Sequence, residues 1–488
     1  MGDATAFADR IVELFALCGD VKIDTLELPG AGDGRHTAVQ LVYCESLCDV
    51  YHLNRLVIPS LFDLFRSRPI PDFIELERHV KLRIVRVDDP SDEEAIVRRV
   101  FRGELLLWFE SFGALCTIDI SDIPARNTEE PNTEVSIKGP KDGFTEELTL
   151  NLGLIRKRLK SNKLAADYYR FGSETETQVA LLYMNNRINS DVLSEIRSKL
   201  GGLNLPELIS STQLEETLSG FSLFPQFAYT GRPDYAVNSL LHGRFVLLVE
   251  GSPTASIAPV TLTYIMNVSE DAHTANLFVT FTRLMRMLGL LFSLFLPGFW
   301  IALMSYHQDQ IPFSLLATLV ISRQGVPLPV PLEAFVMLLL FELFREAGMR
   351  LPSAFGQTLS VVGGLIIGQA AISAGITAPG TIVIVAISVM ATFTLVNQQI
   401  VGMVSILRGV ILLVSGLLGL FGFLFCLLAM ALYLVNLKSF GVYYMEPLAP
   451  PDARDIWKVL FRFPWGKRIS IPASLRKKKR GEGGGNPV

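Results

Sequence analysis

The apolar stretch 287–437 carries only eight charged side chains in 151 positions, and their spacing is suited to chemistry at membrane depth. Four of them recur at three- and four-residue steps, which places them on one helix face where ion pairs form: Glu342, Arg345, Glu346 and Arg350. Glu333 lies near a predicted helix start, where the helix dipole favours a carboxylate. Two interpretations stay open. The charges form a ladder of interfacial ion pairs, or Glu333 or Glu342 contributes to a carboxylate ring in a cation pathway.

Small residues recur along the uncharged stretch Ser353–Ala378 at helical spacing: Ser353, Ser360, Gly364, Gly368, Ala371 and Gly375. Such a stripe lets helices approach closely in lipid, either within one subunit or at a subunit interface or narrow pore wall. Gln369 lies in the same stretch, where an amide needs a hydrogen-bonding partner. The residues that we consider as candidates for a pore or its gate are Glu333, Glu342, Val362, Gly364, Gly368, Gln369 and Gly375.

Other kinds of chemistry find little support in the sequence. The five cysteines and six histidines are scattered, and Cys44-x3-Cys48 lacks the spacing of a zinc site. No nucleophile–base pair and no phosphate-binding loop is apparent. The basic run Leu154–Lys160 has no interleaved aromatic residues, which favours a solvated face or an anionic-lipid contact over nucleic acid. We therefore expect no enzyme activity, no metal, no cofactor and no nucleic-acid partner.

Charge divides the chain into three parts. Residues 1–286 carry 29 Lys/Arg and 40 Asp/Glu, a net charge of −11, whereas the tail after Leu437 has 11 basic and four acidic residues, a net charge of +7. This pattern predicts an acidic water-soluble module, a bilayer-embedded module and a basic tail. The domains that we expect are 1–125, 126–280, 284–437 and 438–488.

The acidic module contains an internal repeat with a constant offset of 140 residues. Ala38–Tyr43 is matched by Gln178–Tyr183, and Gly103–Glu110 is matched by Gly243–Glu250. The first block of each pair is a short apolar run suited to a buried strand, and the second is a strand-turn-strand candidate. Two α/β lobes of related topology account for the shared offset, and the alternative is a chance match between apolar strands.

Four uncharged stretches are candidates for membrane spans. They are Met287–Tyr306, Ser353–Ala378, Gly380–Val396 and Gly409–Val435. The first has 20 residues, enough to cross about 30 Å of hydrocarbon at 1.5 Å per residue. The segment 311–350 contains a proline-rich break before an apolar helix, Leu332–Phe344, which favours a re-entrant or interfacial element over a fifth span.

The basic tail indicates the orientation of the chain. Leu475–Arg480 contains five basic residues, and the positive-inside rule places it in the cytoplasm. The N-terminal module shows no signal peptide, so we expect it to be cytoplasmic as well. Both termini on one side require an even number of spans, which favours four. The sequence thus predicts an α/β cytoplasmic N-terminal module of two related lobes followed by an α-helical polytopic membrane domain.

Motifs spread along the chain give it a resemblance to a known family. In the first half they include Lys138–Glu146, Asn151–Arg158 and Arg232-Pro-Asp234; in the second half, Arg345–Pro352 and Gly368-Gln-Ala370. Over residues 38–465 the chain resembles the A subunit of the GerA family of bacterial spore germination receptors. The residues that carry the resemblance are Arg126, Pro131, Gly139, Phe144, Glu146, Asn151, Arg156, Arg158, Arg232, Pro233, Asp234, Arg345, Glu346, Arg350, Pro352 and Arg408.

The resemblance implies a multi-pass protein of the inner membrane of the dormant spore. It implies a homo-oligomer that assembles with a B-type, transporter-like subunit and a C-type lipoprotein among membrane lipids, and that releases cations in response to nutrient. A non-conducting receptor or scaffold subunit, or an accessory paralogue that binds partners through its α/β lobes, is the alternative.

Overall fold

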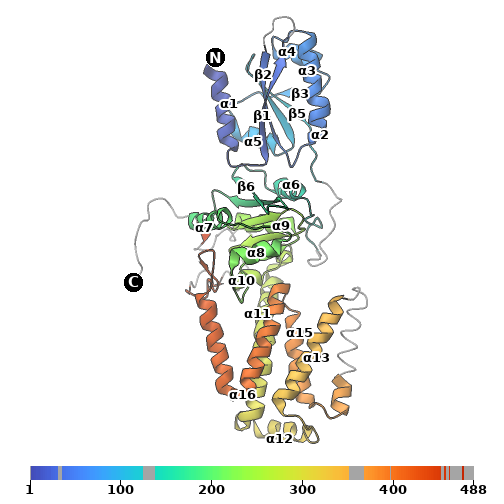
Figure 1. Ribbon diagram of the computed structural model, residues 1–488, viewed down its shortest axis with the longest axis vertical. Coiled ribbons are helices and arrows are strands. Elements are labelled where there is room, and N and C mark those ends of the chain that lie inside the picture. The colour runs from blue at the N-terminus through green and yellow to red at the C-terminus, as the bar shows by residue number, and fades with distance from the viewer. Residues whose placement is uncertain are drawn as a thin grey trace, which may run out of the picture.

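The computed structural model describes residues 2–30, 36–124, 138–350, 368–395, 397–451, 456–457, 461 and 475–476. Two α/β lobes and a helical part follow one another along the long axis of the molecule (Figure 1). The first lobe, with the N-terminus, lies at one end, the second lobe lies in the middle, and the helical part lies at the other end.

The first lobe is an antiparallel sheet covered on both faces. Its strands have the order β1-β2-β4-β5-β3 and are β1 (Val21–Pro29), β2 (His36–Cys44), β3 (Ile84–Arg86), β4 (Glu104–Phe109) and β5 (Ala114–Asp119). Its helices are α1 (Gly2–Phe15), α2 (Val50–His52), α3 (Ile58–Ser67), α4 (Phe73–His79) and α5 (Glu93–Val100). Leu105 and Leu107 face one apolar cluster while Leu106 and Trp108 face another. Burial on both faces explains why this strand is a continuous apolar run.

The second lobe has the same topology. Its strands have the order β6-β7-β9-β10-β8 and are β6 (Leu164–Phe171), β7 (Thr177–Met184), β8 (Ala228–Thr230), β9 (Phe245–Val249) and β10 (Ala255–Ala258). Its helices are α6 (Leu148–Arg158), α7 (Ser190–Gly201), α8 (Ser211–Ser219), α9 (Pro233–Leu241) and α10 (Leu262–Ile265). Leu41 pairs with Leu107 in the first sheet, and Leu181 pairs with Leu247 in the second. The 140-residue repeat therefore extends to individual strand pairs.

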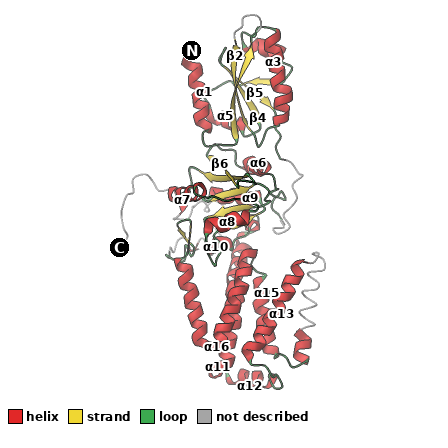
Figure 2. Ribbon diagram, viewed as in Figure 1, coloured by secondary structure: helices red, strands yellow, loops and turns green. Residues whose placement is uncertain are grey.

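The helical part follows the second lobe (Figure 2). It contains α11 (Asn276–Tyr306), α12 (Phe313–Ser322), α13 (Val330–Arg350), α15 (Pro379–Thr392) and α16 (Gln398–Asn436). Within the described residues, α11 and α16 are long and apolar enough to cross a membrane, by length and composition alone. The break predicted within 311–350 is present, since α12 ends at Ser322 and α13 begins at Val330. The 21 residues of α13 give it a length of about 31 Å.

The helix α16 is folded back on itself at Gly419. This glycine has φ +61° and ψ −142°, outside the helical region. Both ends of α16 contact the second lobe. The Gln399 side-chain amide near the start donates to Glu215, and the Tyr433 hydroxyl near the end accepts from the Leu223 amide. The two arms lie side by side in Figure 1. The prediction of one continuous span over Gly409–Val435 is therefore wrong, because a residue conformation open to glycine interrupts it.

After α16 the chain returns to the second lobe. The hairpin of β11 (Lys438–Ser439) and β12 (Val442–Tyr443) places Phe440 against Phe227 and Phe245. The Ser439 hydroxyl donates to the Gln226 carbonyl at 3.0 Å and accepts from the Val260 amide at 3.2 Å. The chain thus enters and leaves the helical part on the side of the second lobe.

Candidate functional site

A buried arginine lies at the centre of the helical part. The Arg408 side chain is 0% exposed and forms an ion pair with Glu342 of α13. Its Nη1 also donates to the Ser388 hydroxyl of α15 at 3.2 Å, and that hydroxyl donates to the Ser293 carbonyl of α11 at 2.9 Å. One guanidinium therefore connects α16 to three other helices.

Glu342 is shared between two arginines. Arg345, one turn further along α13, approaches the second Glu342 carboxylate oxygen at 2.7 Å and donates to the Ser405 hydroxyl of α16 at 2.6 Å. Charges in an apolar helical bundle are costly unless they are paired and hydrogen-bonded. We refer to Ser293, Glu342, Arg345, Ser388, Ser405 and Arg408 as the Arg408 network.

Glu333 is a second buried carboxylate, and every partner of it is internal to the chain. It is 0% exposed; Arg323 approaches Oε2 at 2.8 Å. Oε1 accepts hydrogen bonds from the Thr377 hydroxyl and the Ala378 amide, both at 2.7 Å. The carboxylate thus joins the first turn of α13 to the start of α15. Among the described residues, protein encloses the Glu333 carboxylate on all sides, which suits a group that holds two helices together.

The other pore candidates are spread over different environments. Gln369 is exposed, and a Cβ on Gly368 would lie 3.9 Å from Ile382. Gly375 has φ +67° and lies in the turn before α15, so the predicted helical stripe does not extend to it. Val362 and Gly364 lie outside the described residues, as do the motif residues Arg126, Pro131 and Pro352 and the side chain of Arg350.

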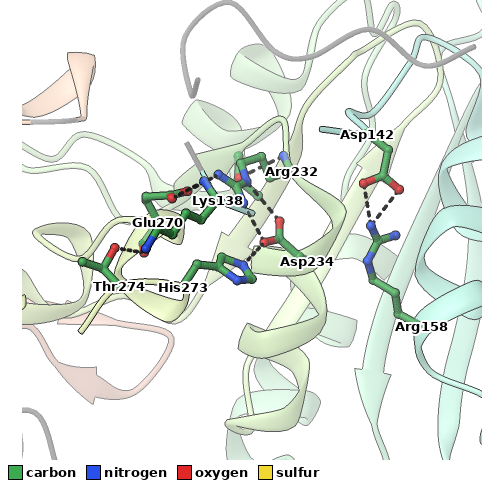
Figure 3. Close-up of polar contacts among 9 residues, drawn as sticks. Lys138, Asp142, Arg158, Arg232, Asp234, Glu270, His273 and Thr274 are labelled. Atoms are coloured by element: carbon green, nitrogen blue, oxygen red, sulfur yellow. Dashed lines mark hydrogen bonds and ion pairs between the residues drawn. The ribbon is translucent and has the colours of Figure 1, made fainter. Parts of the chain in front are cut away.

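A cluster of family-motif residues lies on the second lobe (Figure 3). Arg232 donates to both Asp234 oxygens, at 3.1 and 2.8 Å, and to Glu270 at 3.3 Å. His273 lies 3.1 Å from Asp234, and the Lys138 amide donates to Glu270 at 2.8 Å. Burial raises the pKa of Asp234, but hydrogen bonds from Arg232 and His273 outweigh burial and leave this pKa below its usual value.

Other motif residues form hydrogen bonds within residues 138–158. Arg158 forms a two-point contact with Asp142, at 2.6 and 2.7 Å. The Asn151 side chain binds the Thr145 amide and carbonyl, at 2.7 and 2.6 Å. Four further motif residues occupy loops or helix ends of the same region: Gly139, Phe144, Glu146 and Pro233. The Glu346 backbone belongs to α13.

The junction between the second lobe and α11 is formed by Asp271. Arg286 contacts both Asp271 oxygens, at 2.9 and 2.8 Å, and donates to the Met266 carbonyl at 3.0 Å. Arg283 lies 3.7 Å from the same carboxylate. These two arginines are the last charges before the apolar stretch. They therefore fix the direction in which α11 leaves the lobe.

A buried ion pair joins the two lobes. Arg156 of α6 donates to both oxygens of Asp20, at 2.7 and 2.6 Å, and stacks 4.3 Å above the Phe101 ring. The two side chains are 0% and 1% exposed. Burial alone lowers the pKa of Arg156, but Asp20 raises it above its usual range. Asp20 was not a candidate in the sequence, where nothing distinguishes it from other acidic turn residues.

Glu215 of α8 is a second residue that the sequence did not indicate. Its carboxylate accepts from Ser256 at 2.5 Å and from Gln399 of α16 at 3.3 Å. Burial raises the pKa of Glu215, and the hydrogen bonds from Ser256 and Gln399 only partly offset it. This contact connects the second lobe to the first arm of α16.

The described residues offer no metal centre. In the described ranges, no three His, Cys, Asp or Glu side chains come close enough together to hold a metal ion. The five cysteines are free thiols, and four of them are buried. Burial raises the pKa of Cys18 to about 11, so this thiol stays protonated at neutral pH.

Comparisons with known proteins identify the family. Residues 9–473 match the family described as Bacillus/Clostridium GerA spore germination protein. The chain is 45% identical to spore germination protein XA of Bacillus anthracis, over 94% of each chain. It is 35% identical to spore germination protein GerLA of Bacillus cereus, over 91% of this chain and 89% of that one.

One solved structure is also similar. It is the N-terminal domain of the A subunit of the Bacillus megaterium spore germinant receptor GerK3, with 22% identity, a TM-score of 0.39, and coverage of 51% of this chain and 92% of that one. The family match and the two relatives extend over nearly the whole chain. The chain belongs to the GerA family of spore germination proteins.

Proposed function

We propose that this chain is the membrane subunit of a germinant receptor complex and forms or gates a cation pathway in response to nutrient. The observation that carries the proposal is the Arg408 network, in which one buried guanidinium connects four helices. A simple membrane anchor has no need of buried charges, because charges at membrane depth are costly and are typical of functional sites. Family membership supports the germination role.

The proposal places the helical part in the inner membrane of the spore as a multi-pass domain. In this proposal α11, α13, the segment predicted as the span Ser353–Ala378, α15 and both arms of α16 cross the bilayer, and α12 lies along its far surface. Six crossings replace the four expected from the sequence and keep both termini on one side. The return of residues 438–443 to the second lobe supports a location of the lobes and the tail on the same side of the membrane. The basic tail favours the cytoplasm as that side. The proposed domains keep the boundaries 1–125, 126–280, 284–437 and 438–488.

Glu333 and Glu342 have different roles from pore-lining carboxylates in this proposal. Their protein partners hold α13 against α15 and α16. The pathway wall is assembled between copies of the chain from the segment that contains Val362, Gly364, Gly368 and Gln369. Opening then requires the helices joined by the Arg408 network to shift as a unit, with a B-type subunit and a C-type lipoprotein as the proposed partners.

Bulky substitutions in the small-residue segment test the conduction step. Gly364→Leu and Gly368→Leu are expected to abolish or strongly slow nutrient-triggered potassium release from spores that carry the complete receptor, because a leucine side chain fills the space between close-packed helices. Gly402→Leu is the matched control, since a Cβ on Gly402 has no atom within 4 Å.

Potassium release from these spores and ion flux through the purified complex together separate the two functional hypotheses. Normal potassium release from both Gly364→Leu and Gly368→Leu spores would rule out this segment as the pathway wall. If the purified complex in liposomes also shows no ion flux with or without nutrient, the chain is a non-conducting scaffold subunit.

A further inference from the structure

A short apolar loop of the second lobe lies beside the end of α16. It follows α8 and comprises Gly220–Phe224, which we call the Phe221 loop. The Phe221 side chain is 99% exposed, and Gly220 makes the turn with φ +67°. No charged residue occurs between Thr217 and Gly231, although the surrounding module is rich in charge. An uncharged, aromatic tip of this kind is unusual on a surface that faces water alone.

The loop is attached to the helical part at a defined height. The Leu223 amide donates to the Tyr433 hydroxyl at 3.0 Å, and the Phe224 and Tyr433 rings lie 6.0 Å apart. Tyr433 lies fourteen residues after Gly419, about 21 Å along the second arm of α16 at 1.5 Å per residue. A Cβ on Gly419 would lie 3.0 Å from the Tyr306 side chain, so the fold of α16 and the end of α11 are level.

These lengths place the Phe221 loop within the thickness of a bilayer. The hydrocarbon core is about 30 Å thick, which exceeds the 21 Å between the fold of α16 and Tyr433. Measured up α11 from Tyr306, the same distance reaches Phe292, within the uncharged stretch of that helix. On α16 the first charge beyond Tyr433 is Lys438. The loop is therefore level with the uncharged parts of α11 and α16, near the end of each that faces the second lobe.

We propose that the Phe221 loop inserts into the lipid surface and anchors the second lobe to the bilayer beside α16. The inference rests on the proposed placement of the helices in a membrane. Aromatic rings favour the boundary between headgroups and acyl chains, where Phe221 gains apolar burial. The exposed tip is a single large side chain flanked by Ser222 and Leu223, which is too small for a stable protein interface.

A fluorophore attached to single cysteines tests this insertion in the full chain. We would label Phe221→Cys, and Ser222→Cys as a second position, in a Cys426→Ala background, because Cys426 is half-buried while the other four cysteines are buried. The protein is placed in nanodiscs of phosphatidylcholine and phosphatidylglycerol, with and without brominated acyl chains. Leu424→Cys on the outer face of α16 and Ile74→Cys on α4 of the first lobe are the controls, both exposed.

The expected result is quenching by brominated lipid at position 221 or 222 close to that at position 424 and several-fold above that at position 74. Quenching at 424 alone would overturn the insertion and leave the membrane placement intact. A loop label shielded from a water-soluble quencher but not quenched by brominated lipid would overturn it in favour of a protein partner. Absence of quenching at 424 as well would overturn both the insertion and the proposed membrane function.

Discussion

Arg408 and Glu342 show how two opposite charges are accommodated within an apolar bundle. Arg408 is fully buried, and its Nε has no hydrogen-bond partner among the described residues. Its charge is therefore compensated through Glu342, which also binds Arg345. The pair is thus a condition for packing α13 against α16, as well as a candidate element of gating.

Removing one partner of this pair is expected to cost more than removing both. Glu342→Gln leaves Arg408 buried beside a neutral amide, and loss of one member of a buried pair costs about 3–5 kcal/mol of folding free energy. The double variant Glu342→Gln/Arg408→Gln should recover part of this loss. Thermal unfolding in detergent of the wild-type protein, the single variants Glu342→Gln and Arg408→Gln, and the double variant, analysed as a double-mutant cycle, measures the coupling. Additive losses in the cycle would show that the two side chains act independently.

At the scale of elements, the fold of α16 depends on one glycine. Gly419 has φ +61° and ψ −142°, and a Cβ there would approach the Tyr306 ring to 3.0 Å. The Tyr306 hydroxyl donates to the Gly416 carbonyl at 2.8 Å, so it binds a backbone acceptor that the interrupted helix leaves open. The two arms are therefore held by conformation and by Tyr306 together.

Gly419→Ala is expected to destabilise the helical part by about 1–3 kcal/mol, because alanine disfavours this backbone conformation. Gly409→Ala provides the matched control. Gly409 is helical in the same element, and a Cβ there has no atom within 4 Å, so alanine should be neutral or stabilising. Melting temperatures of both variants in detergent decide the point, and equal values would contradict the role of Gly419.

At the scale of the whole molecule, the buried Asp20–Arg156 pair joins the two lobes. The β-bridge between Cys18 and Ala166 lies next to it, so backbone and side chains join the lobes at one place. The contact between the lobes therefore combines a backbone bridge with a buried ion pair.

Asp20→Ala is expected to lower the free energy of unfolding by about 3–5 kcal/mol, since it leaves the buried Arg156 guanidinium without its carboxylate. The control is Lys22→Ala, whose partner Glu45 and own side chain are nearly half exposed, and which should cost about 0–1 kcal/mol. Denaturant unfolding followed by circular dichroism compares the two. Similar losses for both variants would show that the interlobe pair contributes no more than a surface pair.

Local patterns made part of this architecture predictable. The apolar runs of β2, β4, β7 and β9 are strong strand signals, and their 140-residue repeat predicted two related sheets. The ion-pair spacing from Glu342 to Arg345 was also predictable, because both residues lie on one helix. Long-range partners were not. Arg156 pairs with Asp20 across 136 residues, and the fold at Gly419 depends on Tyr306, so neither has a local signature.

The hairpin of α16 has a mechanical consequence. Its two open ends are attached to the second lobe, at Glu215 and at the Phe221 loop, while its closed end rests against Tyr306 at the far side of the helical part. The second lobe thus holds both arms of α16 at their open ends. We expect a tilt of the second lobe to pull one arm and push the other, with the chain bending at Gly419. Arg408 belongs to the first arm, so its network would move with that arm.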